Sequence, residues 1–112
     1  MKRFVVTKWS GEFRFEDEAM TEEEVKAFVR TNMNDHGMYA DVTAFFDNLA
    51  DAKIIFDEAK KYLSIKEFPS NGIMVIPWLT LEEEETDEDG ELIPSDRWIE
   101  EFYPEKGEGN LS

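Results

Sequence analysis

The chain has 112 residues, which suits one domain with a single modest core and is too short for two. Hydrophobic residues make up 41% of the chain and aromatic residues 13%, a composition that argues against a wholly disordered protein. Twelve basic residues oppose 27 acidic ones, and the formal net charge of −15 excludes nucleic acid and anionic membranes as direct partners. Such a protein is attracted instead to basic protein surfaces.

The absence of cysteine excludes disulfides, zinc–thiolate sites and cysteine nucleophiles. The apolar run at the start of the chain is broken at Lys8, too early for a secretory signal. No run approaches the ~20 apolar residues that a membrane-spanning helix needs. We therefore expect a cytoplasmic protein.

The first predicted element is a β-hairpin. Residues 3–9 and 12–16 are short runs rich in β-branched and aromatic residues, and Ser10 and Gly11 separate them. In the second run Phe13 and Phe15 share one face of the expected strand, which is the pattern of a half-buried strand. We expect the chain to turn at Gly11.

A helix over residues 22–35 is predicted next. Thr21 and Glu24 have capping-box spacing, and the carboxylates of residues 22–24 suit the first turn of a helix. Val25 and Val29 then begin an apolar stripe. The helix is expected to stop at residues 36–37, where His36 precedes a glycine.

Residues 41–63 carry apolar side chains at intervals of three and four, which predicts one long helix or two helices joined near Asp51. A short strand over residues 53–56 is the alternative. Residues 65–68 and 73–78 then flank a turn-rich tetrad, Pro-Ser-Asn-Gly, and predict a second hairpin whose last strand ends at Pro77.

The last predicted element is a helix that begins near Pro94 and Ser95 and ends before Pro104, with an apolar stripe that includes Trp98 and Phe102. The predicted order is ββ-α-α-ββ-α. The fold class is α+β, with a small antiparallel sheet formed by two hairpins and packed against two or three helices. Residues 1–104 form the domain, with an acidic segment at 81–96, and residues 105–112 form a flexible tail.

Most of the negative charge lies in the C-terminal third. Residues 81–112 hold thirteen acidic and two basic residues, a net charge of −11, and residues 1–80 supply the remaining −4. The acidic segment 81–96, LEEEETDEDGELIPSD, contains no lysine or arginine. Two interpretations stay open for this segment: a solubilising loop, and a binding surface that the ordered segments on either side attach to the fold.

The residues expected to bind a partner are carboxylates of this segment, two more carboxylates on the last predicted helix, and one exposed tryptophan. They are Glu82, Glu83, Glu84, Glu85, Asp87, Glu88, Asp89, Glu91, Glu100, Glu101 and Trp98. Trp98 is the candidate anchor because interface hot spots favour a tryptophan ringed by polar residues. The alternative acidic site, residues 22–24, is better explained as ordinary charge in a first helical turn.

A calcium site is a weaker interpretation of the same segment. If Gly90 is the turn glycine of an EF-hand loop, the candidate ligands are Glu85, Asp87, Asp89 and Asp96. The first ligand is then Glu instead of Asp, the twelfth is Asp where a bidentate Glu is wanted, and Pro94 interrupts the loop. We expect no bound metal and no cofactor.

Signals for an enzyme are weak. His36 is the only histidine, and its place beside a glycine suits a helix C-terminus better than a general base. No GxxxxGK[ST], GxGxxG or GxSxG motif occurs in the sequence. Among 27 acidic residues a pair such as Asp57 and Glu58 arises by chance, so carboxylate pairs carry little information. We expect a protein without catalytic activity.

A small, very acidic, cysteine-free chain resembles, in charge, size and composition, the DNA-mimic inhibitors that phages and plasmids deploy against restriction or CRISPR systems. The resemblance implies an anti-restriction or anti-CRISPR protein whose ordered carboxylates take the place of phosphates on a basic, nucleic-acid-binding protein. One alternative is an immunity protein or antitoxin that blocks a basic nuclease or toxin. A calcium-responsive acidic module is an alternative of another class.

Overall fold

The computed structural model describes residues 2–32 and 38–107. Its elements, in chain order, are β1 (Lys2–Arg14), α1 (Glu22–Asn32), β2 (Met38–Phe46), α2 (Leu49–Lys60), β3 (Lys66–Phe68), a 3-10 turn (Pro69–Asn71), β4 (Ile73–Thr86) and β5 (Leu92–Phe102). The α+β class and the antiparallel sheet are confirmed. The predicted order is only partly right. The first part of the second predicted helix is a strand, the last predicted helix is a strand, and the first predicted hairpin is a single strand.

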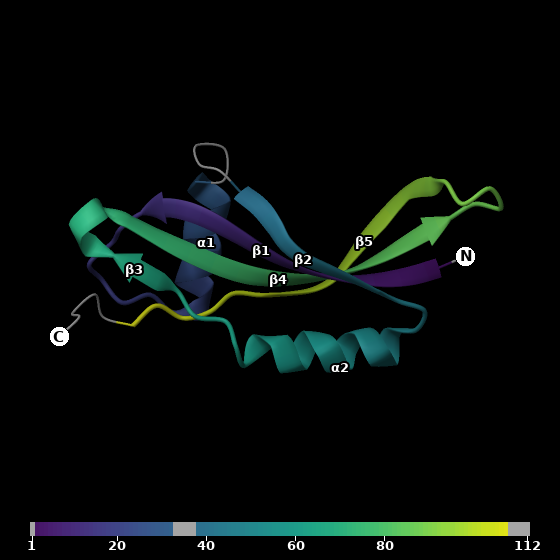
Figure 1. Cartoon of the computed structure of the whole chain (residues 1–112), viewed down its shortest axis with the longest axis horizontal. Helices are drawn as coiled ribbons and strands as arrows, with labels where there is room; N and C mark the ends of the chain where they lie inside the picture. The colour runs from purple at the N-terminus through teal and green to yellow at the C-terminus, as the bar shows by residue number, and fades with distance from the viewer. Residues whose placement is uncertain (1, 33–37, 108–112) are drawn as a thin grey trace.

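Strand β4 is the centre of the sheet. Strand β1 pairs along one edge of β4 over nearly its whole length, and β2 pairs with the far edge of β1. The other edge of β4 is shared: β3 pairs with its first residues, and β5 pairs with it from Leu79 to Thr86. The molecule is therefore elongated, with extents of 54 × 28 × 20 Å, and the β4–β5 hairpin forms one end of it (Figure 1).

The predicted turn at Ser10 and Gly11 is wrong, because β1 runs straight through both residues. Gly11 is buried in the strand opposite Ile76, and a Cβ atom there would lie 2.6 Å from the Phe13 ring and 3.4 Å from Trp78. The glycine serves close packing against aromatic rings instead of a positive φ angle.

The prediction that the strand after Ile73 ends at Pro77 is also wrong. Strand β4 continues through Pro77 as far as Thr86. Pro77 lies opposite Ser10 of β1, but on the other edge of β4 the pairing with β3 stops at Val75 and the pairing with β5 starts at Leu79. A proline is tolerated in this strand at a gap between two neighbouring strands.

Helix α1 matches its prediction over the described residues. The Thr21 hydroxyl accepts a hydrogen bond from the Glu24 backbone N–H at 3.3 Å, and the Glu24 carboxylate accepts one from the Thr21 N–H at 3.1 Å, so the capping box forms. Val25 and Val29 are fully buried. The last predicted turn and the stop at His36 lie outside the described residues.

The predicted helix over residues 41–63 is wrong in its first part. Residues up to Phe46 form strand β2, and helix α2 begins at Leu49. Asn48 separates the two elements: its side chain accepts a hydrogen bond from the Asp51 backbone N–H at 2.8 Å and caps the helix. Helix α2 includes residues 53–56, so the alternative of a strand there is also wrong.

The predicted helix after Pro94 is wrong as well, since those residues form strand β5. Consecutive residues of a strand point to opposite faces, and Glu100 and Glu101 do so here. Glu100 forms ion pairs with Lys53 of α2, and Glu101 forms ion pairs with Arg30 of α1. Pairing with β4 therefore overrides the helical spacing of the apolar residues.

The two helices cover opposite faces of the sheet. Met74, Ile76 and Trp78 of β4 pack with Val25 and Val29 of α1 in one core cluster. Leu79 and Leu81 of the same strand point to the other face, where they pack with Ala52 and Phe56 of α2 in a second cluster. The nearly continuous apolar run of β4 is explained by burial on both faces.

The chain after β5 is docked on the domain as far as Lys106, although the predicted tail begins at residue 105. Lys106 is 2% exposed, forms an isolated β-bridge with Met20, and places its ammonium 3.2 Å from a carboxylate oxygen of Glu67. Residues 108–112 of the predicted tail lie outside the described residues. Neither described helix has the length and apolar character needed to cross a membrane.

Candidate functional site

The acidic segment is a β-hairpin instead of a loop. Residues 82–86 are the last residues of β4, residues 87–91 form the turn, and β5 returns along β4, with Glu85 opposite Ile93 and Glu82 opposite Trp98. We call residues 82–98 the acidic hairpin. Along β4 the carboxylates alternate between the two faces, so neighbours on one face are roughly 7 Å apart.

Two carboxylates of β4 are already paired within the protein. Glu84 lies 2.8 Å from the guanidinium of Arg3, and Glu83 lies 3.6 Å from the ammonium of Lys2. Their side chains are only 15% and 18% exposed, respectively. These pairs attach the base of the acidic hairpin to β1, and they reduce the negative charge that the base presents to solvent.

The turn of the acidic hairpin is held by Asp87. Its carboxylate accepts hydrogen bonds from the backbone N–H groups of Asp89 and Glu91, both at 2.9 Å, and its backbone N–H donates to the Glu91 carbonyl. Gly90 has a φ angle of +85°, which glycine adopts without strain. Asp87, Glu88, Asp89 and Glu91 are all exposed. The most exposed carboxylates of the segment therefore lie on a hydrogen-bonded turn.

Glu100 and Glu101 bind helices of the same chain. Glu100 contacts the ammonium groups of Lys53 and Lys60 on α2. The hydrogen bond that Lys53 donates to the Glu100 carboxylate is the main cause of a raised pKa at Lys53. These carboxylates connect β5 to the helices and lie outside the acidic hairpin.

Glu101 also affects a buried tyrosine. It forms ion pairs with Lys26 and Arg30 of α1 and accepts a hydrogen bond from the Tyr103 hydroxyl at 3.1 Å. Burial, together with the negative charge of Glu101, raises the pKa of Tyr103 to about 12. Glu101 is thus surrounded by partners from its own chain.

Trp98 is 59% exposed and lies next to Ile99, which is 42% exposed. Its position opposite Glu82 places it on the strand that returns from the acidic turn. The carboxylate across from Trp98, Glu82, is partly buried, and the exposed carboxylates of the turn begin five residues further along β4. Trp98 is therefore an exposed apolar side chain at the base of the acidic hairpin.

The predicted site residues therefore fall into three groups. The four turn carboxylates and Trp98 are exposed on one hairpin, Glu82 to Glu85 are partly buried at its base, and Glu100 and Glu101 are engaged by helices. At least nine of the twelve basic side chains form ion pairs within the protein: Lys2, Arg3, Lys8, Lys26, Arg30, Lys53, Lys60, Lys61 and Lys106. None of these ion pairs involves the four carboxylates of the turn, so the turn presents concentrated negative charge to solvent.

The geometry differs from an EF-hand. Glu85 and Asp96 lie on paired strands instead of a loop that wraps around an ion, and one oxygen of Asp87 already accepts two backbone hydrogen bonds. Among the side chains that the structure describes, which leave out those of residues 92–97, no group of three or more His, Cys, Asp or Glu is arranged to hold a metal ion.

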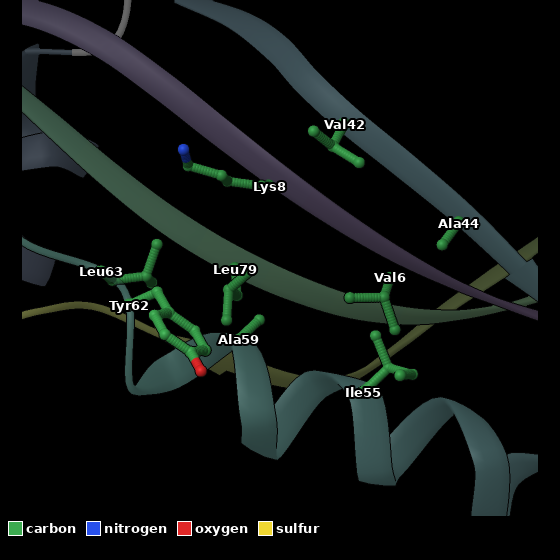
Figure 2. A pocket seen from close by; sticks show the side chains of 9 residues that line it. All are labelled: Val6, Lys8, Val42, Ala44, Ile55, Ala59, Tyr62, Leu63 and Leu79. Atoms are coloured by element: carbon green, nitrogen blue, oxygen red, sulfur yellow. The ribbon is translucent and has the colours of Figure 1, made fainter.

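One exposed surface was missed at the level of the sequence. Between α2 and the β1–β2 strands lies an apolar trough of about 250 Å³ (Figure 2), whose lining includes Val42 of β2 and Ile55 and Tyr62 from the α2 region. The prediction of a helix over residues 41–63 concealed it. Asn48, which stands three residues before Asp51 and is a favoured helix-capping residue, is the signal that could have located the end of a strand and the start of a helix.

Comparisons of the sequence and the fold with known proteins found no matching family model, no matching curated protein and no matching solved structure.

Proposed function

We propose that this protein is a non-catalytic, acidic inhibitor that binds a positively charged, nucleic-acid-binding protein through the acidic hairpin. The observation that carries the proposal is the turn at Asp87, Glu88, Asp89 and Glu91, where four exposed carboxylates are held by strand pairing and by the hydrogen bonds of Asp87. Carboxylates in a fixed arrangement take the place of phosphates in the basic groove of the partner.

Order in the hairpin favours tight binding. A flexible acidic tail loses conformational freedom when it docks, whereas a paired hairpin has lost that freedom on folding. The negative charge of the turn accelerates association with a basic surface, and this rate falls as salt rises. Trp98 supplies exposed apolar area at the base of the same hairpin, and burial of this area in the complex slows dissociation.

The class of partner follows from the charge. A groove that binds duplex DNA must neutralise one negative charge per ~1.7 Å of the helix axis, so it concentrates lysine and arginine where the acidic turn can dock. A restriction or CRISPR enzyme and a basic nuclease toxin both present such a groove. The immunity-protein or antitoxin alternative uses the same surface, and the identity of the partner distinguishes it from the anti-restriction function.

The test compares capture of partners from a bacterial lysate by three forms of the protein. In the hairpin variant, Glu88, Asp89 and Glu91 are changed to Lys, while Asp87 is kept because it holds the turn. In the control variant, the exposed Glu12, Asp17 and Glu18 are changed to Lys, which alters the net charge equally. Proteins are eluted by a salt gradient and identified by mass spectrometry.

We expect the wild type and the control variant to retain one nucleic-acid enzyme up to a defined, moderate salt concentration. The hairpin variant should lose at least ~100-fold in affinity, because close charge pairs at an interface each contribute on the order of 1.5 kcal/mol or more. Equal capture by the hairpin variant, or a broad set of basic proteins that elutes at low salt from all three forms, would contradict the proposal.

A further inference from the structure

Strand β2 is an open edge of the sheet. Among the described strands it pairs only with β1, so the backbone groups along its outer side have no strand partner. Natural proteins protect such edges with lysines, prolines or bulges, because an unprotected edge pairs with another chain. The strand has a bulge at Asp41, between the pairs of Val42 and Ala40, but residues 42–46 beyond it are regular and contain no charge and no proline.

The surface around this edge is apolar. Val42 is 60% exposed, Phe45 55% and Ile55 42%, and Tyr62 at the rim of the trough is 80% exposed. Figure 2 shows Val42 and Ala44 on one wall of the trough and Ile55 on the other. We call residues 42–46, Ile55 and Tyr62 the β2 edge surface.

The segment that contains the β2 edge surface is nearly neutral, unlike the rest of the chain. Residues 38–66 contain five acidic and four basic residues, a net charge of −1, against −15 for the whole chain. Asp41, the only charged residue of β2, accepts a hydrogen bond from the Ser10 hydroxyl and forms an ion pair with Lys8 at 3.6 Å. The β2 edge surface therefore has no charge that would attract a basic partner.

We propose that the β2 edge surface binds a second copy of this chain, with the two β2 strands paired antiparallel over residues 42–46 about a two-fold axis. In this register Ala44 lies at the axis, Val42 lies opposite Phe46, and Thr43 lies opposite Phe45, so the run complements itself. The β-branched and aromatic pairs that result are among the stabilising cross-strand pairs of sheets. This proposal is independent of the acidic hairpin.

The antiparallel arrangement also separates the acidic turns. Ala44 lies across from Val6, and Val6 lies across from Leu81, six residues before the turn at Asp87. At ~3.3 Å per residue each turn is ~20 Å from the axis, and the two turns point in opposite directions, ~40 Å apart. Because the Debye length at physiological salt is ~8 Å, the two turns repel each other little in the dimer.

Exposed aromatic side chains supply somewhat less than half of the area that a stable dimer buries. With roughly 200 Å² for an aromatic side chain, the exposed fractions of Phe45 and Tyr62 offer roughly 270 Å² per copy, or about 540 Å² for the pair. Stable interfaces bury at least about 1,200 Å² in total. Val42 and Ile55 add further exposed apolar area, and pairing of the two strands adds backbone contacts.

Sedimentation velocity of the full chain, from low to high micromolar concentration at physiological salt, tests this proposal. The wild type should form a species of twice the chain mass of 13.1 kDa. Val42→Lys should raise the dissociation constant at least tenfold, since a lysine is a natural protection of an edge. Ile54→Lys is the control. Ile54 is 59% exposed, like Val42 at 60%, but it lies on α2 and does not line the trough, so the Ile54→Lys variant should dimerise as the wild type does.

Two further measurements exclude unfolding of a variant as the cause of a lost dimer and locate the contact between the copies. Thermal melting checks that both variants fold, and concentration-dependent hydrogen-exchange protection of the β2 amides in the wild type locates the contact without any substitution. A wild type that stays monomeric at every concentration, a Val42→Lys variant that dimerises as well as the wild type, or a dimer lost in the Glu88, Asp89 and Glu91 to Lys variant would overturn the proposal.

Discussion

Side chains of β5 and of the segment after it connect the sheet to both helices. Glu101 is shared between Lys26 and Arg30 of α1 and the hydroxyl of Tyr103. The Tyr103 ring is stacked on Trp78, with ring centroids 6.1 Å apart, and only 4% of the residue is exposed. A phenolate at this place would be both desolvated and close to a carboxylate, so the neutral phenol is favoured in the folded state.

This environment predicts a loss of stability in alkali. The pKa of Tyr103 is about 12 in the folded protein and 10.0 ordinarily. The contribution of the neutral phenol is therefore fully present below pH 10 and is lost as the pH rises from 10 to 12. The free energy of unfolding of the wild type should fall by roughly 2 kcal/mol more than that of Tyr103→Phe across this range. Urea unfolding of both proteins at a series of pH values measures it, and parallel pH profiles would rule the explanation out.

At the scale of elements, the predictions that the structure confirms are those that depend on residues close together in the sequence. The capping box at Thr21 and Glu24 and the turn before Ile73 depend on neighbouring residues, and both lie where the sequence placed them. Gly72, at the end of that turn, has a φ angle of +68°, which glycine adopts without strain.

The errors lie where long-range pairing decides. Gly11, Pro77 and the apolar spacing after Trp98 are ordinary signals of a turn, a strand end and a helix, yet all three positions belong to long strands. Strand β4 gains hydrogen bonds along both edges and burial on both faces, and these contributions override local propensity. The order of the acidic segment also comes from long-range pairing, with β1 and β5, so local signals left a loop and an ordered surface both open.

The boundary between β2 and α2 rests on one side chain. Asn48→Ala should destabilise the protein by about 1 kcal/mol, because the Asp51 backbone N–H loses its acceptor at the start of α2. Asn48→Ser keeps an acceptor and should cost clearly less. Urea unfolding gives both values. Equal stability of all three proteins would mean that packing of Ala52 and Phe56 alone sets the start of the helix.

At the scale of the whole molecule, two surfaces of different character lie on one elongated sheet. The acidic hairpin forms one end, with exposed carboxylates and Trp98 (Figure 1). The β2 edge surface lies along one side and is nearly neutral. Salt should act on them in opposite directions: it weakens binding of a basic partner to the hairpin, and it leaves dimerisation unchanged or strengthens it by screening repulsion between copies.

The most direct test of the proposed inhibition is a competition at a fixed, moderate salt concentration. The nucleic-acid enzyme captured by the wild type is bound to a fluorescently labelled DNA duplex, and the anisotropy of the duplex is followed as the protein is added. The wild type and the Glu12, Asp17 and Glu18 to Lys control should release the duplex, and the Glu88, Asp89 and Glu91 to Lys variant should not. A duplex that stays bound at saturating wild-type protein, or that the hairpin variant releases equally well, would contradict phosphate mimicry by the acidic hairpin.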